Sequence, residues 1–268
     1  MKLRKNLSIT WMLIKMGWQS QISYMGLSAL FSYIAQIIQF AARFGVVWIM
    51  MRSFTDLAGF NMWEVFILFS LELFSYAVAN SFLQPFWKMK ELVLGGELDF
   101  YLIRPLTPLY YVMSKGFVPG YTAHMVISSI ILVVSAFQLG LAASLSFWLL
   151  VLFTIIVGSG IQFGLRCIPA FLTFWFGNID NLHWVVGTFR NMVQYPLKIY
   201  PAVVQVFLTA VLPFAFVNYF PSLLLFEKIP VLNGILLFAL GILVSAAMVA
   251  VPVFMFTRGL RKYESGNG

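Results

Sequence analysis

Long apolar runs separated by short polar stretches make up most of the chain. A membrane-crossing helix needs about 20 mostly apolar residues at a rise of about 1.5 Å per residue. Six runs come close to that requirement, and they cover approximately residues 24–51, 62–86, 109–137, 147–176, 199–216 and 231–256. The pattern predicts an all-α integral membrane protein with six transmembrane helices in a single domain over residues 1–268.

Basic residues are distributed unequally between the two sides of these runs. If the N-terminus is cytoplasmic, thirteen of the 17 Lys and Arg residues fall on the inner side: Lys2, Arg4, Lys5, Lys15, Lys88, Lys90, Arg104, Lys115, Arg190, Lys198, Arg258, Arg261 and Lys262. The outer side receives Arg52 and Lys228, and Arg43 and Arg166 fall inside spans. Cytoplasmic loops are enriched in Lys and Arg, so both termini are predicted to be cytoplasmic.

Residues 1–20 carry a helical stripe ahead of the first span. Leu7, Trp11, Ile14 and Trp18 recur at i, i+4, i+7 and i+11, which places them on one helical face. This pattern predicts a helix in the inner membrane interface, with its tryptophans at headgroup depth. The alternative is a simple N-terminal extension of the first span. Lys15 interrupts the apolar part, so the segment is interpreted as retained rather than as a cleaved signal peptide.

Composition supports a membrane protein and excludes several other classes. Of the 268 residues, 61% are hydrophobic and only 10% are charged, against about 25% charged in an ordinary soluble domain. The basic residues are dispersed between apolar runs, so they are expected to meet lipid headgroups, and no nucleic acid partner is expected. One cysteine, Cys167, permits no intramolecular disulfide. His124 and His183 have no ligand spacing with each other, so no metal site is predicted.

The most polar stretch between two apolar runs is "KMKELVLGGELDFYLIRPLT", residues 88–107. The second span is expected to continue to Gly95 and Gly96, because glycine takes the left-handed conformation of a helix C-cap without Cβ strain. A short cytoplasmic helix should follow, with Leu98, Tyr101 and Leu102 on one apolar face. Charged residues and a proline surround this face, and the segment comprises Glu97, Leu98, Asp99, Tyr101, Leu102, Arg104 and Pro105. This helix either docks a soluble partner or rests on lipid as an amphipathic loop.

Two prolines interrupt the region between the fifth and sixth spans. Pro213 removes a backbone donor and Pro221 disfavours helix at the preceding residue, so a break between them is expected. One interpretation is a re-entrant outer hairpin that forms a gate, and the other is a loop on the outer surface. The residues assigned to the gate are Pro213, Phe214, Phe216, Asn218, Tyr219, Phe220 and Pro221.

Arg43 and Glu72 are ionisable residues deep inside neighbouring predicted spans. Arg43 and Glu72 lie roughly 14 and 16 Å from the outer ends of their spans at about 1.5 Å per residue. Unpaired charge is costly in a membrane, so a structural salt bridge between them is the favoured interpretation. A substrate-contacting or proton-carrying site is the alternative. The connection 178–201 is predicted to be a second interfacial helix on the inner side, used mainly for lipid contact.

Two segments resemble a known family. "GELDFYLIRPLTPLYYV" (96–112) is similar to the signature of membrane subunits of type-2 ABC exporters, in the six-span branch without a fused ATPase, and "LPFAFVNYFPSLLL" (212–225) resembles the same family's pattern near the outer end of span five. The resemblance implies a permease domain, and it implies that residues 88–107 contain the coupling helix. The residues that it implies for contact with the ATPase are Glu97, Leu98, Asp99, Tyr101, Leu102, Arg104 and Pro105. It further implies a bacterial plasma membrane location and a dimer with a second permease subunit, related or identical.

The resemblance also implies two copies of a cytoplasmic ATP-binding subunit, which would hold ATP and Mg²⁺. No G-x-x-x-x-G-K-[ST] motif occurs in the chain, so no phosphate-binding loop is expected here, and the chain is not expected to be an enzyme. The substrate would be an amphipathic or hydrophobic lipid, peptide or drug. The competing classes are a secondary-active transporter or channel that needs no ATPase, and a membrane anchor or intramembrane enzyme, for which no catalytic motif is found.

Overall fold

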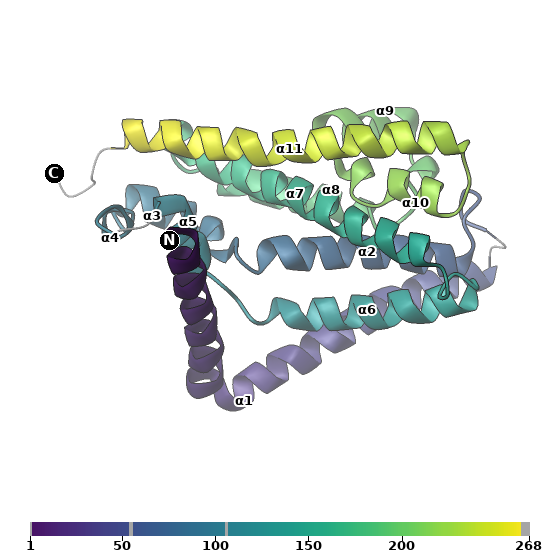
Figure 1. The fold of residues 1–268 in the computed structure, drawn as a ribbon, viewed down its shortest axis with the longest axis horizontal. Coiled ribbons are helices and arrows are strands. Elements are labelled where there is room, and N and C mark those ends of the chain that lie inside the picture. The colour runs from purple at the N-terminus through teal and green to yellow at the C-terminus, as the bar shows by residue number, and fades with distance from the viewer. Residues whose placement is uncertain (1, 54–55, 105–106, 264–268) are drawn as a thin grey trace.

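The computed structural model describes residues 2–53, 56–104 and 107–263 as a bundle of helices (Figure 1). These residues contain no β-strand, so the all-α prediction is confirmed. The long helices are α1 (Lys2–Ser53), α2 (Met62–Asn80), α6 (Tyr121–Gln138), α7 (Leu145–Phe176) and α11 (Val231–Lys262). Five helices, counting Tyr33–Arg52 of α1, are long and apolar enough to cross a membrane, or six if one bent pair counts as a span.

Helix α2 occupies the centre of the bundle. Every side chain from Glu64 to Leu73 is buried, as expected for a helix that is apolar on all faces. It packs against α6 and α7, and α7 packs against α11. Asn61 caps its first turn by accepting from the Glu64 amide while the Glu64 carboxylate accepts from the Asn61 amide. This capping box positions the start of α2 beside the 56–60 loop.

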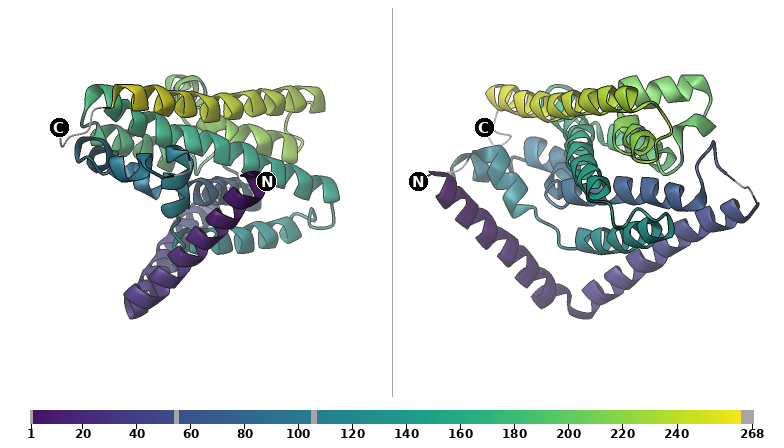
Figure 2. Two further views of the ribbon diagram at one scale, coloured as in Figure 1. Left: turned by 60° about the vertical axis from the view of Figure 1, so that its left-hand side comes forward. Right: turned by 45° about the vertical axis from the view of Figure 1, so that its right-hand side comes forward.

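Helix α1 is one continuous helix that changes direction. Its dark purple N-terminal part stands at a steep angle to the lighter part that joins the bundle (Figures 1 and 2). Trp11 is 71% exposed, whereas the side chains of Leu7, Ile14 and Trp18 lie outside the described residues. A helix turned across the bundle axis is compatible with the predicted interfacial location, which stays a prediction.

The end of the bundle that carries the C-terminus is called the inner end here, after the predicted orientation. At this end, short helices replace parts of two predicted spans. They are η1 (Gln84–Lys88), α3 (Met89–Leu94), α4 (Asp99–Leu102) and α5 (Pro108–Lys115). The second span therefore ends at Asn80 rather than near residue 86. The third begins at Tyr121 rather than near 109, because the chain turns at 116–120, where a side chain on Gly116 would collide with the Pro85 ring.

The connection after α7 corrects the predicted inner-side helix. Helix α8 (Asp180–Met192) runs along the bundle in the direction opposite to α2, with His183 buried and Trp184 74% exposed. Near its start, the ring centroid of His183 lies 5.6 Å from that of Trp87. Near its end, Arg190 reaches Glu72 at the middle of α2, with Nε and Oε1 2.6 Å apart. Helix α8 thus carries the chain back toward the outer end, and most of its residues do not lie in the inner interface.

The fifth predicted span, 199–216, was therefore wrong in its position. Lys198, assigned to the inner side above, lines a cavity with Gly59 of the loop between α1 and α2, so the chain has already reached the outer end there. Segment Ala202–Val211, made of α9 (Ala202–Val206) and the π-helical η3 (Phe207–Val211), is then bent by 78° against Phe214–Leu225. Without Arg190 and Lys198 the inner side still holds eleven of the 17 basic residues.

The hairpin formed by 202–225 enters and leaves the bundle at the same end. Both of its arms, at Gln205 and at Leu223, line the outer cavity with Gly59. Its turn lies deeper, because Phe214 lines a small cavity with Arg190. The second arm comprises η4 (Phe214–Phe216) and α10 (Tyr219–Leu225), and the geometry is that of a re-entrant hairpin.

Small residues let α7 and α11 approach closely. Gly160 and Gly164 form a G-x-x-x-G pair on α7, a spacing that places both on one face of a membrane helix. A Cβ atom on Gly160 would collide with the Ser245 hydroxyl, and one on Gly164 would collide with the Met248 carbonyl oxygen. The backbone of α11 is thus held against α7 at this crossing.

We expect Gly164→Ala to lower the free energy of unfolding by about 1 to 3 kcal/mol, because the added methyl group meets backbone that cannot rotate away. The matched control is Gly45→Ala in α1, where an added Cβ has no neighbour within 4 Å. Thermal unfolding of both variants in the same detergent checks the prediction, and equal melting temperatures would contradict the close α7–α11 contact.

Candidate functional site

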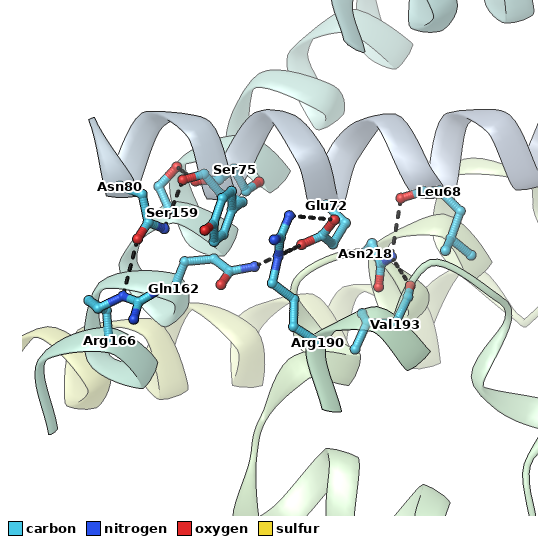
Figure 3. A network of polar contacts seen from close by, with 11 residues as sticks. Leu68, Glu72, Ser75, Asn80, Ser159, Gln162, Arg166, Arg190, Val193 and Asn218 are labelled. Carbon is cyan, nitrogen blue, oxygen red and sulfur yellow. Dashed lines mark hydrogen bonds and ion pairs between the residues drawn. The ribbon is translucent and has the colours of Figure 1, made fainter. Parts of the chain in front are cut away.

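A carboxylate and an arginine form an ion pair in the middle of the bundle. Glu72 on α2 is fully buried. Arg190 on α8 donates from Nε to Oε1 over 2.6 Å and from Nη2 to Oε2 over 3.4 Å (Figure 3). Gln162 on α7 donates from Nε2 to Oε1 over 3.3 Å. Three helices therefore meet at one carboxylate, and the two-point contact fixes the orientation of the guanidinium.

An aromatic ring completes the surroundings of Arg190. The guanidinium carbon lies 3.2 Å from the centroid of the Tyr76 ring, one helical turn from Glu72 on α2. Cation–π contact is strongest where water is excluded. The positive charge of Arg190 is thus compensated on two sides by residues of the same helix.

A second arginine lies nearer the inner end and has neutral partners. Arg166 on α7 donates from Nε to Oδ1 of Asn80 over 3.2 Å (Figure 3), and its guanidinium carbon lies 3.4 Å from the centroid of the Trp87 ring. Its Nη1 is 3.4 Å from Nδ1 of His183. Among the described residues no carboxylate lies within ion-pair distance of Arg166.

The predicted pair of Arg43 with Glu72 is wrong. The Glu72 carboxylate pairs with Arg190 of α8, and Arg43 of α1 borders a cavity next to this pair without an ion pair to Glu72. Sequence position gave the depth of both residues but not the direction in which Glu72 faces. Arg190 was missed because its helix was assigned to the inner interface. The amphipathic pattern of 178–201 contains no signal that separates a helix at the interface from one whose arginine reaches a buried carboxylate.

Asn218 ties the re-entrant hairpin to this network. Its Nδ2 donates to the Leu68 carbonyl of α2 over 3.1 Å and to the Val193 carbonyl after α8 over 2.7 Å (Figure 3). Of the residues assigned to the gate, Pro213, Phe214, Phe216, Asn218 and Pro221 are buried, and Tyr219 and Phe220 are half-buried. The hairpin is therefore packed into protein, as irregular backbone at membrane depth requires.

The outer arms of the hairpin border a large open cavity. Its volume is about 830 Å³, and it lies between the hairpin and the 58–60 loop. Lys228, beyond the second arm, closes one edge by donating to the Gly59 carbonyl over 2.7 Å and by pairing with Glu64 over 2.9 Å. The hairpin thus separates this outer cavity from the buried polar network.

At the inner end, the predicted docking face is corrected in part. Gly96 has φ of +73°, the left-handed turn expected of it, and it lets the Leu98 amide donate to the Leu92 carbonyl over 2.9 Å. Leu98 is fully buried, and Tyr101 is half-buried beside Lys115. These two residues anchor α4 rather than dock a partner, because the short helix turns its i, i+3 face toward the bundle.

The exposed face of this segment consists of other side chains. Phe100 is 69% exposed, Leu102 41% and Ile103 78%, whereas only Leu102 among them was predicted to face a partner. Glu97 and Arg104 are exposed at the two ends of α4, and Asp99 is half-buried. Pro105 lies outside the described residues.

The Leu98 anchor belongs to an apolar cluster that joins the short helices to two long ones. Leu98 and Leu92 are buried together with Phe171 and Phe174 of α7 and Phe256 of α11. Tyr263, just after α11, packs against the same cluster. Partial burial, together with the Asp99 carboxylate, raises the pKa of the Tyr263 phenol to about 12. A push on α4 would therefore be transmitted to α7 and α11.

The buried network and the exposed face of α4 are suited to binding and to conformational change. Among the residues that the structure describes, no group of three His, Cys, Asp or Glu side chains is placed to hold a metal ion. The sole cysteine, Cys167, is buried. The buried network can hold helices in register, and the exposed face of α4 can contact another molecule.

We expect Glu72→Leu and Arg190→Leu each to lower the free energy of unfolding by about 3 to 5 kcal/mol, because each leaves an uncompensated buried charge. The double variant should lose less than the sum of the two. Arg43→Leu serves as the control and should cost less than either, since it removes no ion pair among the described residues. Thermal unfolding of the four variants measures this, and strictly additive losses would reject the pair.

The comparisons with known proteins agree with this architecture. A family model described as ABC-2 family transporter protein matches residues 36–267, which is most of the chain. No match was found among curated proteins or among solved structures. The matched region contains the α3–α4 segment, the buried network and the re-entrant hairpin. The chain belongs to the ABC-2 family of transporter membrane proteins and is a multi-pass permease of an ABC transporter.

Proposed function

We propose that this permease is the transmembrane subunit of an ATP-driven exporter that moves an amphipathic or hydrophobic substrate outward. The observation that carries the proposal is the exposed apolar face of α4. Phe100 and Ile103 are 69% and 78% exposed at the end of the bundle where the C-terminus also lies (Figure 1). An apolar face with charged residues on either side is typical of a protein-docking surface, and we assign it to a cytoplasmic ATP-binding subunit.

ATP binding and hydrolysis are assigned to that partner. The chain has no G-x-x-x-x-G-K-[ST] motif, so two copies of a separate ATP-binding subunit would hold ATP and Mg²⁺. A transporter with two such subunits needs two permease subunits, and we propose a dimer of this chain with a related or identical permease in a bacterial plasma membrane.

The coupling mechanism follows from the apolar cluster behind α4. Closure of the ATP-binding subunits around nucleotide would push on α4, and the buried Leu98 would pass the movement to α7 and α11. Helix α7 also carries Gln162 of the buried network. The movement would therefore reach Glu72 and Arg190, and through Asn218 the hairpin. Rigid movement of packed helices is a common switching mode.

The hairpin itself is proposed as the outer gate. It separates the outer cavity from the polar network, and its aromatic side chains Phe214 and Phe216 are buried at the turn. Export past this point would require the hairpin to shift toward the outer cavity, which borders both of its arms.

Affinity purification of the tagged chain from its native membrane tests the assignment of the partner. We expect an ATP-binding subunit to co-purify, with vanadate-sensitive ATP hydrolysis. Changing Phe100→Glu and Ile103→Glu together should lower the recovered subunit about tenfold or more, as loss of an apolar anchor does at interfaces. The control is Leu145→Glu, which alters a 73% exposed leucine at the outer end of α7.

The variants must elute and unfold like the parent chain for the comparison to count. Retained capture by the Phe100 and Ile103 variant would reject α4 as the docking site. Recovery of the parent chain alone in several mild detergents, without hydrolysis, would instead support a secondary-active transporter or channel.

Cross-linking tests the gate separately. The ring centroids of Phe60 in the outer loop and Tyr219 in the hairpin lie 6.0 Å apart. Cysteines at these two positions, in a Cys167→Ser background, should be joined by a short thiol cross-linker. We expect the cross-linked complex to keep its ATP-binding subunit but to lose most of its substrate-stimulated hydrolysis. Unchanged hydrolysis after complete cross-linking would show that the hairpin does not need to move.

A further inference from the structure

A polar cavity lies between α1 and the Glu72 network, whose Tyr76 and Arg190 form part of its lining. Its volume is about 360 Å³, and α1, α2 and α6 contribute most of its lining. Gln36, Gln39 and Arg43 line it from α1 at i, i+3 and i+7, one face of the helix. Tyr121 lines it from α6, and Arg190 of α8 reaches its inner wall.

The cavity carries an excess of positive charge. Arg190 is neutralised by Glu72. Arg43 makes neither a hydrogen bond nor an ion pair with any residue that the structure describes, and its guanidinium lies 5.5 Å from the centroid of the Phe40 ring. Glu72 attracts Arg43 at longer range, so one carboxylate faces two arginines. An unpaired arginine at membrane depth is costly, and a guanidinium pairs best with a planar carboxylate or a phosphate. The site therefore favours a bound anion.

A second polar group in the cavity also has no partner. The Oε1 atom of Gln36 is buried and makes no hydrogen bond with the described part of the chain. A buried acceptor without a donor costs free energy comparable to a lost hydrogen bond. A hydroxyl group beside the anion would satisfy it.

The borders of the cavity are suited to an acyl chain. Ile37 and Ile38 of α1 are 49% and 63% exposed, and Ile130 of α6 is 57% exposed, so apolar side chains that face outward flank the polar lining on both helices. Tyr33 ties α1 to the start of α6 by donating to the Pro119 carbonyl over 3.0 Å. A ligand with a polar head in the cavity can thus keep an apolar tail in the membrane.

We propose that the cavity between α1, α2 and α6 binds the anionic, hydroxyl-bearing headgroup of a single- or double-chain amphiphile, with Arg43 as its main electrostatic contact. That this amphiphile is the transported substrate rests on the proposed export function. The binding site itself rests only on the unpaired Arg43, the unpaired Gln36 carbonyl and the apolar borders.

Native mass spectrometry of the full chain in a neutral maltoside detergent tests the site. The probes are lysophosphatidylglycerol and lysophosphatidylcholine of equal chain length, which differ in net charge and in headgroup hydroxyls. We expect a one-to-one adduct with the anionic probe at a concentration at least tenfold lower than with the zwitterionic probe. Arg43→Gln should weaken the anionic adduct at least tenfold, and Arg43→Lys should restore part of the affinity.

The matched control is Arg52→Gln, which removes an arginine from the outer end of the same helix, where it stacks on Trp48. Its affinity should stay within twofold of the parent. Equal binding of both probes, or equal losses in Arg43→Gln and Arg52→Gln, would overturn the proposal. An Arg43→Gln variant that unfolds at a lower temperature is replaced in this comparison by Gln36→Leu, which should weaken the anionic adduct severalfold; unchanged binding by it would also overturn the proposal.

Soluble phosphate is the remaining source of an anion. Inorganic phosphate and glycerol phosphate, each added without an acyl chain, should displace the anionic probe only at concentrations at least a hundredfold higher. Displacement at equal concentration would overturn the assignment of an amphiphile. Capture of the ATP-binding subunit by the same preparations is measured alongside, so that loss of the amphiphile site with retained capture contradicts this inference alone.

Discussion

The ion pair of Glu72 with Arg190 is the interaction on which the rest of the bundle depends. A carboxylate at the centre of a buried helix requires a positive partner, and the two-point contact with Arg190 provides it. Because Arg190 lies near the end of α8, this pairing holds the end of that helix against the middle of α2. The carbonyl of Val193, one turn further along the chain, then becomes an acceptor for Asn218, and the re-entrant hairpin is positioned by the same arrangement.

The buried network and the inner apolar cluster are joined by one helix. Helix α7 supplies Gln162 to the network and Phe171 and Phe174 to the cluster behind α4. Its close contact with α11 through Gly160 and Gly164 leaves little room for independent movement of the two helices. A rigid pair of helices that touches both the proposed docking segment and the network would suit the coupling proposed above.

Three arginines at membrane depth are treated in three different ways. Arg190 has a carboxylate, and Arg166 has neutral hydrogen-bond and aromatic partners. Arg43 lies beside the Phe40 ring and, within the described part of the chain, has no hydrogen bond or ion pair. These differences separate arginines with a structural role from one with a binding role. A charge that is already compensated within the protein gains little free energy from binding a ligand. The least compensated arginine is also the one that borders an open polar cavity.

Sequence alone determined four features: the all-α class, the concentration of positive charge at one end, the break near Pro213 and the turn at Gly96. Each depends on hydropathy, charge or backbone preferences that are local. The resemblance in 96–112 also pointed to the segment that is proposed here to dock a partner. The partner of Glu72, the path of α8 and the inward orientation of Leu98 were decided only by tertiary structure. Each depends on which helix faces which. Hydrophobic periodicity gives a residue's face and depth on its own helix, but it contains no information about the neighbour across the interface.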